Sequence, residues 1–133
     1  MILVDTNILV DVVTDDPFWA DWSQQQLTLA AARDELAIND IVYAELSVRY
    51  TTIEELDAMI REASLVSAAI PRPALFLAAK AFQRYRSAGG VKTGVLPDFF
   101  IGAHAVISDS LLITRDAARY RTYFPGIALI APN

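Results

Sequence analysis

The chain has 133 residues, of which 54% are apolar, and it carries a formal net charge of −5. This length and composition predict one globular domain over residues 1–133 with a sizeable buried core. The lack of cysteine excludes disulfides and thiolate metal sites, no apolar stretch reaches the roughly 18 residues of a membrane span, and no basic stretch precedes the first apolar run as in a secretory leader. We therefore expect a soluble protein of the reducing cytoplasm with no membrane partner.

Short apolar strands alternate with helices along the sequence. In chain order, we expect a strand at 2–5, a helix at 17–33, a strand at 36–40, helices at 41–49 and 52–63, a strand at 65–70, helices at 73–87 and 97–107, a strand at 111–114, a helix at 116–123 and a strand at 127–132. Residues that can accept hydrogen bonds from free backbone N–H groups mark three helix starts, at Asp15 or Asp16, at Asn39 or Asp40, and at Thr51 or Thr52. The stretch SAGGVKTG, residues 87–94, predicts a flexible and partly basic loop.

This alternation predicts an α/β fold. Strands separated by helices pair in parallel through right-handed crossovers, and helices cover both faces of such a sheet. Ligands of open α/β sheets bind at the carboxyl ends of the strands, near the point where the strand order reverses. We therefore look for functional side chains just after the strands.

Four acidic residues can reach that edge of the sheet, namely Asp5, Glu45, Asp98 and Asp116. Asp5 ends the first strand and Asp116 follows a later one, so both project from one edge if these two strands are neighbours. Glu45 lies about one and a half turns into the helix after the second strand, and Asp98 lies in the first turn of its own helix. If the four converge, like charges about 4 Å apart repel by roughly 4 kcal/mol per pair at an effective dielectric constant near 20. Protons or cations must then neutralise them.

This acidic set favours a hard divalent cation. Carboxylate oxygens, without cysteine or paired histidines, suit Mg²⁺ or Mn²⁺. Such an ion activates water and stabilises the leaving oxygen in phosphodiester hydrolysis. Nine of the 11 basic residues are arginine, which suits bidentate phosphate contacts, and four liganded carboxylates would leave the remaining surface close to neutral. The acidic net charge therefore does not exclude a nucleic-acid substrate.

Several stretches of the sequence resemble one family. They are MILVDTNILVDV at the start, IVYAELS around residue 45, LPDFFIGAHAV around residue 98, and LLITRDAARYRTYF with GIALIAP near the end. Together they resemble the PIN domain, specifically the VapC-type ribonuclease toxins of bacterial and archaeal toxin/antitoxin pairs. The resemblance implies a three-layer α/β/α fold around a central parallel sheet and Mg²⁺- or Mn²⁺-dependent endonucleolytic cleavage of RNA. It also implies a homodimer that a cognate antitoxin protein holds inactive by docking near the active site.

The resemblance also implies roles for individual residues. The catalytic and metal-binding acidic positions of the family match Asp5, Glu45, Asp98 and Asp116. A polar residue two positions after the first aspartate matches Asn7, and the Ser or Thr before the last aspartate matches Thr114; both would orient metal ligands or water. The last motif departs from the family, which often has an acidic residue and Phe soon after the final aspartate, because here the aromatic comes only at Tyr120, Tyr123 or Phe124.

Five basic residues near the acidic set are candidates for RNA binding, namely Arg84, Arg86, Lys92, Arg115 and Arg119. The first three precede Asp98 and could equally form a solvated helix face. Arg115 and Arg119 flank Asp116 and could instead contact an antitoxin.

Purely structural roles are also open for these acidic residues. Asp5 can close a strand, Glu45 can be a solvated helix position, and Asp98 and Asp116 can serve as helix caps. Asp11 is expected at a cap or on the solvated surface, although it could lie near the site. The single histidine, His104, lies in an apolar run, so we expect it to be buried and not catalytic, which argues against a ribonuclease mechanism that uses two histidines.

Two other classes of protein also have acidic residues at or just after the first strand. A haloacid-dehalogenase-like phosphatase needs a second aspartate where Asn7 stands and a later lysine, and a phosphoacceptor receiver domain needs an acidic pair and a late lysine. No lysine follows Lys92, which disfavours both classes. A non-catalytic binding module of the PIN fold stays as an alternative, although the presence of all four carboxylates argues against it.

Overall fold

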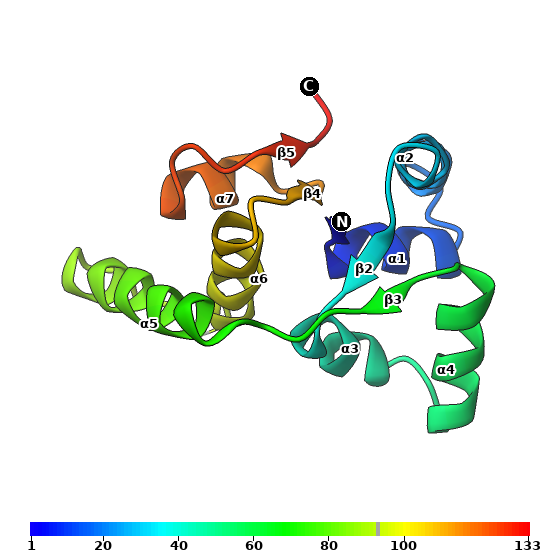
Figure 1. The fold of residues 1–133 in the computed structure, drawn as a ribbon, viewed down its shortest axis with the longest axis horizontal. Coiled ribbons are helices and arrows are strands. Elements are labelled where there is room, and N and C mark those ends of the chain that lie inside the picture. Colours follow the sequence, from blue (N-terminus) through cyan, green and yellow to red (C-terminus); the bar gives the residue numbers. More distant parts are fainter. Residues whose placement is uncertain (93) are drawn as a thin grey trace.

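The computed structural model describes residues 1–92 and 94–133 (Figure 1). Its helices are α1 (Thr6–Val13), α2 (Ala20–Ala31), α3 (Asp40–Ser47), α4 (Ile53–Glu62), α5 (Arg72–Ser87), α6 (Leu96–Ile107) and α7 (Ala117–Tyr123). Its strands are β1 (Ile2–Val4), β2 (Leu36–Ile38), β3 (Val66–Ser67), β4 (Leu111–Ile113) and β5 (Leu129–Ile130). Across the described residues, no helix combines the length and the apolar content needed to cross a bilayer.

The five strands form one parallel sheet in the order β3-β2-β1-β4-β5. Ile2 of β1 pairs with Leu36 of β2 on one side and with Leu111 of β4 on the other. Helices flank the sheet (Figure 1), which confirms the expected three-layer α/β/α fold. The strand order reverses beside β1, because the chain runs outward from β1 to β2 and β3 and later returns to β4 on the opposite side. The carboxyl ends of β1 and β4 therefore meet at the reversal point.

The central strands are buried on both faces. Every residue of β1 and β2 is buried, and Leu112 and Ile113 of β4 are fully enclosed. A strand that helices cover on both sides needs an unbroken apolar run, and these strands have the sequences ILV, LAI and LLI. Burying a side chain such as Leu3 stabilises the fold by roughly 1.5–3 kcal/mol. The first polar side chain after β1, Asp5, therefore lies where the apolar run ends, at the edge of the sheet, and is itself buried.

The sequence did not predict helix α1, which the structure contains. Its eight residues, TNILVDVV, include several β-branched side chains, which favour strands. The carboxylate of Asp5 accepts a hydrogen bond from the backbone N–H of Thr6 at 2.8 Å and caps the helix. Ile8 and Leu9 are buried in the main core. Tertiary packing and the cap therefore outweigh the weak local preference.

Two of the expected helix caps are confirmed, and one differs. The side chain of Asn39 accepts two backbone hydrogen bonds, at 3.0 and 3.1 Å, at the start of α3, and the Thr52 hydroxyl accepts one at 3.2 Å in α4. Asp16 instead accepts hydrogen bonds from the backbone N–H groups of Phe18 and Trp19, both at 2.9 Å. These bonds close a separate turn, so α2 begins later than the expected start at residue 17.

The edge strands β3 and β5 have two residues each and are shorter than the expected strands at 65–70 and 127–132. Each of them pairs with only one neighbour, so fewer hydrogen bonds extend the strand.

A second apolar cluster joins α5, α6 and α7. Small alanines of α5 pack with Phe99 and Ala103 of α6. Gly102 of α6 allows α7 to approach closely, because a Cβ atom at this position would lie 2.5 Å from the ring of Phe124 and 3.1 Å from that of Tyr120. This close contact sets the packing of the aromatic residues of the last motif, and Tyr120 is completely buried.

Candidate active site

Four acidic side chains line one cavity at the carboxyl ends of β1 and β4. The cavity has a volume of about 240 Å³, and its lining includes Asp5, Glu45, Asp98 and Asp116. Asp5 follows β1 directly, and its backbone N–H donates a hydrogen bond to the carbonyl of Ile113 in β4 at 2.9 Å. The strands that precede Asp5 and Asp116 are therefore neighbours, and the structure brings the four carboxylates together around one space.

Asp5 is the most buried of the four, with 4% of its surface exposed. Its Oδ1 accepts a hydrogen bond from the backbone N–H of Thr6 at 2.8 Å. Its Oδ2 accepts one from the hydroxyl of Thr114 at 2.8 Å and one from that of Tyr120 at 3.0 Å. Burial raises the pKa of Asp5 to about 6, and the charge of Asp98 adds to this increase while the hydrogen bonds oppose it. At neutral pH, ionised Asp5 is thus a buried charge that a cation would stabilise.

Glu45 and Asp98 are partly buried. The hydroxyl of Thr6 donates a hydrogen bond to Oε1 of Glu45 at 2.6 Å, and Arg119 donates one to Oδ2 of Asp98 at 2.7 Å. Burial raises the pKa of both carboxyl groups. The negative charge of Asp98 contributes to the increase at Glu45, whereas the hydrogen bond from Arg119 opposes the increase at Asp98.

Asp116 is the most accessible of the four, because 49% of its side chain is exposed. Its Oδ2 lies 3.7 Å from Nη1 of Arg119, the same nitrogen that binds Asp98. One guanidinium group therefore bridges two carboxylates of the cavity. The side chain of Arg119 is itself 41% exposed, so it has room to move.

Asn7 and Thr114 lie where they can orient Asp5. The Thr114 hydroxyl donates to Asp5 and accepts a hydrogen bond from the backbone N–H of Asp116 at 3.0 Å. The Asn7 amide donates to Oδ2 of Asp5 at 3.4 Å, and its carbonyl oxygen accepts a hydrogen bond from the backbone N–H of Arg115 at 3.3 Å. These two side chains therefore connect the first aspartate of the cavity to the loop that carries the last one.

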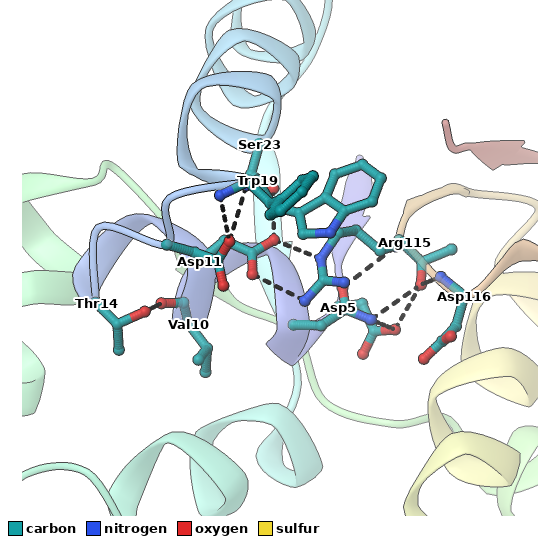
Figure 2. A network of polar contacts seen from close by, with 12 residues as sticks. Asp5, Val10, Asp11, Thr14, Trp19, Ser23, Arg115 and Asp116 are labelled. Carbon is teal, nitrogen blue, oxygen red and sulfur yellow. Dashed lines mark hydrogen bonds and ion pairs between the residues drawn. The ribbon is translucent and has the colours of Figure 1, made fainter. Parts of the chain in front are cut away.

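The guanidinium of Arg115 is held by a buried carboxylate (Figure 2). Arg115 Nε and Nη2 donate to the two carboxylate oxygens of Asp11 at 2.6 and 2.9 Å. Asp11 is only 1% exposed and also accepts a hydrogen bond from the hydroxyl of Ser23 at 2.8 Å. The guanidinium carbon lies 5.0 Å from the centre of the Trp19 ring. This network ties α1 and α2 to the loop before α7, and it holds Asp11 in a buried ion pair in place of the expected cap or solvated position.

Tyr120 is a residue of the site that the sequence reading did not assign. It is fully buried, and its hydroxyl contacts Asp5 and lies 3.5 Å from Oδ1 of Asp98. The feature of the sequence that could have identified Tyr120 is the position of the aromatic residues in the last motif, which come later than is usual in the family. Tyr120 lies four residues after Asp116, so one turn of α7 brings it to the same side as that carboxylate.

The other residues singled out in the sequence lie elsewhere. Arg84, Arg86 and Lys92 are exposed on α5 and the following loop and do not line the carboxylate cavity. His104 is 1% exposed, and its Nδ1 lies 3.1 Å from the amide nitrogen of Asn39. It is therefore a buried, hydrogen-bonded histidine outside the cavity, as expected.

The donors around the cavity fit a hard divalent cation. They are carboxylate, hydroxyl and amide oxygens, the ligands that Mg²⁺ and Mn²⁺ prefer. Within the described part of the chain, no three acidic or histidine side chains already surround one point at which a metal ion could bind. Arg119 lies against two of the carboxylates, so a cation would compete with this guanidinium for Asp98 and Asp116.

Solved structures share this fold. VapBC2 from Rickettsia felis, solved bound to a DNA fragment from its promoter, matches with a TM-score of 0.75 and 22% identity over 100% of both chains. A toxin-antitoxin complex from Klebsiella pneumoniae matches with a TM-score of 0.68 and 24% identity over 100% of this chain and 98% of the other. VapBC-1 from nontypeable Haemophilus influenzae matches with a TM-score of 0.73 and 18% identity over 98% of both chains. At these identities, the likeness establishes the fold.

The sequence itself matches a family model. A comparison with curated protein sequences finds no match. The model of the PIN domain, however, matches residues 2–125, which include all four carboxylates of the cavity. Because this match spans nearly the whole chain, the protein belongs to the PIN domain family.

Proposed function

We propose that this protein is an endoribonuclease that hydrolyses RNA phosphodiester bonds with Mg²⁺ or Mn²⁺. The observation that carries the proposal is the convergence of Asp5, Glu45, Asp98 and Asp116 on one cavity at the switch point of the sheet. Membership of the PIN domain family and the fold shared with toxin-antitoxin complexes support it.

The four carboxylates are the proposed metal ligands. Burial raises the pKa of three of them, Asp5, Glu45 and Asp98, so their ionised forms favour a neutralising cation. A divalent ion bound there would activate water and neutralise charge on the phosphoryl group. Thr6, Thr114 and Asn7 would keep the carboxylates oriented.

The basic residues take different parts in this proposal. Arg119 would leave Asp98 and Asp116 when a cation binds, and its guanidinium would then contact the RNA phosphate. Arg84, Arg86 and Lys92 are exposed and would bind the RNA backbone outside the cavity. The guanidinium of Arg115 donates two hydrogen bonds to Asp11, so we propose that Arg115 anchors the loop before α7 rather than binding RNA.

We further propose that the protein is the cytoplasmic toxin of a toxin/antitoxin pair, and that it forms a homodimer. The motifs of the sequence resemble VapC-type toxins along nearly the whole chain. The solved structures from Klebsiella pneumoniae and Rickettsia felis that share its fold are a toxin-antitoxin complex and a VapBC complex.

A second candidate is a non-catalytic binding module with the PIN fold. The observation that favours it is the ion pair between Arg119 and Asp98, which already satisfies one carboxylate of the cavity without a metal. The two candidates differ in what they predict for metal binding and RNA cleavage.

The test is to incubate the partner-free protein with a total RNA pool in Mg²⁺, in Mn²⁺ and in chelator. Asp98→Asn removes one proposed ligand, and Asp21→Asn is its matched control, because Asp21 lies in the first turn of α2 but outside the cavity. Cleavage that needs metal, survives in Asp21→Asn and is lost in Asp98→Asn is the expected result. Mn²⁺ binding measured by calorimetry is expected to weaken in Asp98→Asn alone.

Other outcomes contradict the proposal. Cleavage that survives chelator would rule out the metal mechanism. Folded protein that binds neither Mn²⁺ nor Mg²⁺ and cuts no RNA would favour the binding module.

A further inference from the structure

A second cavity, of about 480 Å³, lies between the C-terminal end of α5 and that of α7. Arg84, Tyr85 and the small residues 88–90 line it from the side of α5, and Thr122 and Tyr123 line it from the side of α7. It shares no lining residue with the carboxylate cavity. We call it the tyrosine cavity.

The two tyrosines of this cavity are held in place by their neighbours. Their ring centroids are 5.6 Å apart at an interplanar angle of 67°, and Tyr123 also stacks on Phe99 at 4.2 Å and 18°. The Tyr85 hydroxyl accepts a hydrogen bond from the backbone N–H of Lys92 at 3.0 Å. Gly90 lets the Tyr85 ring lie against the backbone, because a Cβ atom at this position would lie 2.4 Å from the ring. Both rings are partly exposed, so they form a fixed aromatic surface that a ligand can reach.

The charge of the tyrosine cavity is positive, although the whole chain is acidic. Its lining contains Arg84 and no acidic residue. Arg84 is exposed and takes part in none of the ion pairs found between described residues, and the exposed Lys92 follows in the next loop. The face of one tyrosine ring, with the other ring inclined to it and a guanidinium nearby, fits a ligand with a flat ring and a negative charge. A nucleotide has both.

Helix α7 links the tyrosine cavity to the carboxylates. Arg119, which binds Asp98, and Tyr123 are four residues apart and so lie on one side of the helix. Four residues of α-helix rise by about 6 Å, and stacked nucleotides advance by about 3.4 Å per step. Phe99, the ring under Tyr123, is also the immediate neighbour of Asp98. A strand of RNA that enters the carboxylate cavity therefore needs only a few nucleotides to reach the tyrosines.

We propose that the tyrosine cavity binds one unpaired nucleotide of the RNA substrate close to the scissile phosphate, with its base against Tyr85 and Tyr123 and its phosphate on Arg84. This inference rests on the proposed ribonuclease function and adds to it a base-binding site outside the carboxylate cavity. Base pairing would keep the base out of the cavity, since stacking on a side chain requires an unstacked base.

The test measures RNA binding in chelator, so that no cleavage takes place. The probe is a single-stranded oligoribonucleotide that carries a fluorescent adenine analogue, moved along the strand from one oligonucleotide to the next. Ala88→Leu fills the cavity from an exposed position, and Ala79→Leu is its control on an exposed part of the same helix outside the cavity. Arg84→Gln removes the cation, and Arg72→Gln, at the other end of α5, is its control.

We expect the wild-type protein to quench the analogue at one position of the strand. Ala88→Leu and Arg84→Gln should weaken binding by about tenfold, which is typical of the loss of one stacked base or one charged contact. Both control variants should bind like the wild type. A duplex of the same sequence should bind more weakly and be insensitive to Ala88→Leu.

Three results would overturn the inference. In the first, the cavity variants bind the single strand as tightly as their controls do. In the second, the cavity variants lose equal affinity for the single strand and for the duplex. In the third, the cavity variants bind RNA normally but no longer bind a co-purifying antitoxin. If the first result comes with intact RNA cleavage, it refutes nucleotide binding in the tyrosine cavity but not the nuclease activity. Conversely, suppose that the cavity variants weaken RNA binding but the wild-type protein cuts no RNA. That result would refute the nuclease but not the tyrosine cavity.

Discussion

The hydroxyl of Tyr120 lies 3.0 Å from Oδ2 of Asp5 and 3.5 Å from Oδ1 of Asp98. One fully buried phenol thus contacts two carboxylates that are far from it along the chain. A phenol has a single proton to donate, and the shorter distance indicates that Asp5 receives it. Together with Thr114 and Thr6, Tyr120 keeps the buried carboxylate of Asp5 supplied with hydrogen bonds.

We expect Tyr120→Phe to keep the fold and to raise the pKa of Asp5 further. Phenylalanine preserves the ring between α6 and α7 but removes one of the hydrogen bonds that lower this pKa. Loss of the bond should lower the free energy of unfolding by about 1 kcal/mol. Carboxyl-detected NMR titration measures the pKa directly. Tyr50→Phe removes a hydroxyl outside the cavity and is the control, and an unchanged Asp5 titration would contradict the assigned contact.

The second prediction concerns stability and pH. Asp5 has a pKa of about 6 in the folded protein, whereas its ordinary value in an unfolded chain is 3.8, so the folded protein binds this proton more tightly than the unfolded chain. Its contribution to stability is therefore fully present below about pH 4 and is lost as the pH rises through about 6. Asp5→Asn removes the titration. In chelator, the variant should gain about 2.5 kcal/mol over the wild type between pH 4 and pH 7.

Urea unfolding of both proteins at a series of pH values measures this difference. Comparing Asp5→Asn with the wild type removes the contribution of the other titrating groups, and Asp21→Asn controls for the loss of a carboxylate. A difference that stays constant over this range would mean that Asp5 titrates alike in the folded and unfolded states.

The third prediction concerns the ion pair between Asp11 and Arg115. Asp11→Asn removes the charge but keeps the shape, and it leaves the guanidinium without its buried partner. Breaking a buried pair costs about 3–5 kcal/mol, and because the Arg115 side chain is 28% exposed we expect about 3 kcal/mol in urea unfolding. Asp34→Asn, which breaks an exposed pair with the N-terminus, should cost much less, because water screens that pair.

A double variant tests whether the unpaired arginine causes this loss. Replacing both partners, as Asp11→Asn with Arg115→Gln, should restore part of the stability because no charge is then left unpaired. Equal losses in the single and double variants would place the cost in packing rather than in charge.

The fourth prediction concerns competition between Arg119 and a metal ion. Arg119→Gln frees Asp98 and Asp116 from a positive charge, so Mn²⁺ should bind about fivefold more tightly, which corresponds to about 1 kcal/mol. Calorimetric titration measures this affinity. Arg121→Gln, an exposed change on the same helix, is the control. Equal Mn²⁺ affinities of Arg119→Gln and Arg121→Gln would mean that Arg119 does not compete with the cation.

Local sequence patterns determined much of this fold. Buried strands need unbroken apolar runs, and β1, β2 and β4 were expected where they lie for that reason. Asn39 and Thr52 cap their helices through hydrogen bonds to residues two or three positions away, so a short stretch of sequence contains the whole signal. Asp5 and Asp116 follow strands, and the rule for α/β sheets was enough to predict that they share an edge.

Tertiary structure alone decided the rest. Helix α1 forms from β-branched residues because Ile8 and Leu9 are buried and Asp5 caps it. The partners of Asp11 and Asp5, namely Arg115 and Tyr120, lie 104 and 115 residues further along the chain, and no local pattern connects groups so far apart. The sequence by itself determined which chemistry the edge of the sheet can hold, because residue type and strand position are local properties. Only the packing of α7 against α6 decided that the Tyr120 hydroxyl supports Asp5, because that contact joins distant parts of the chain.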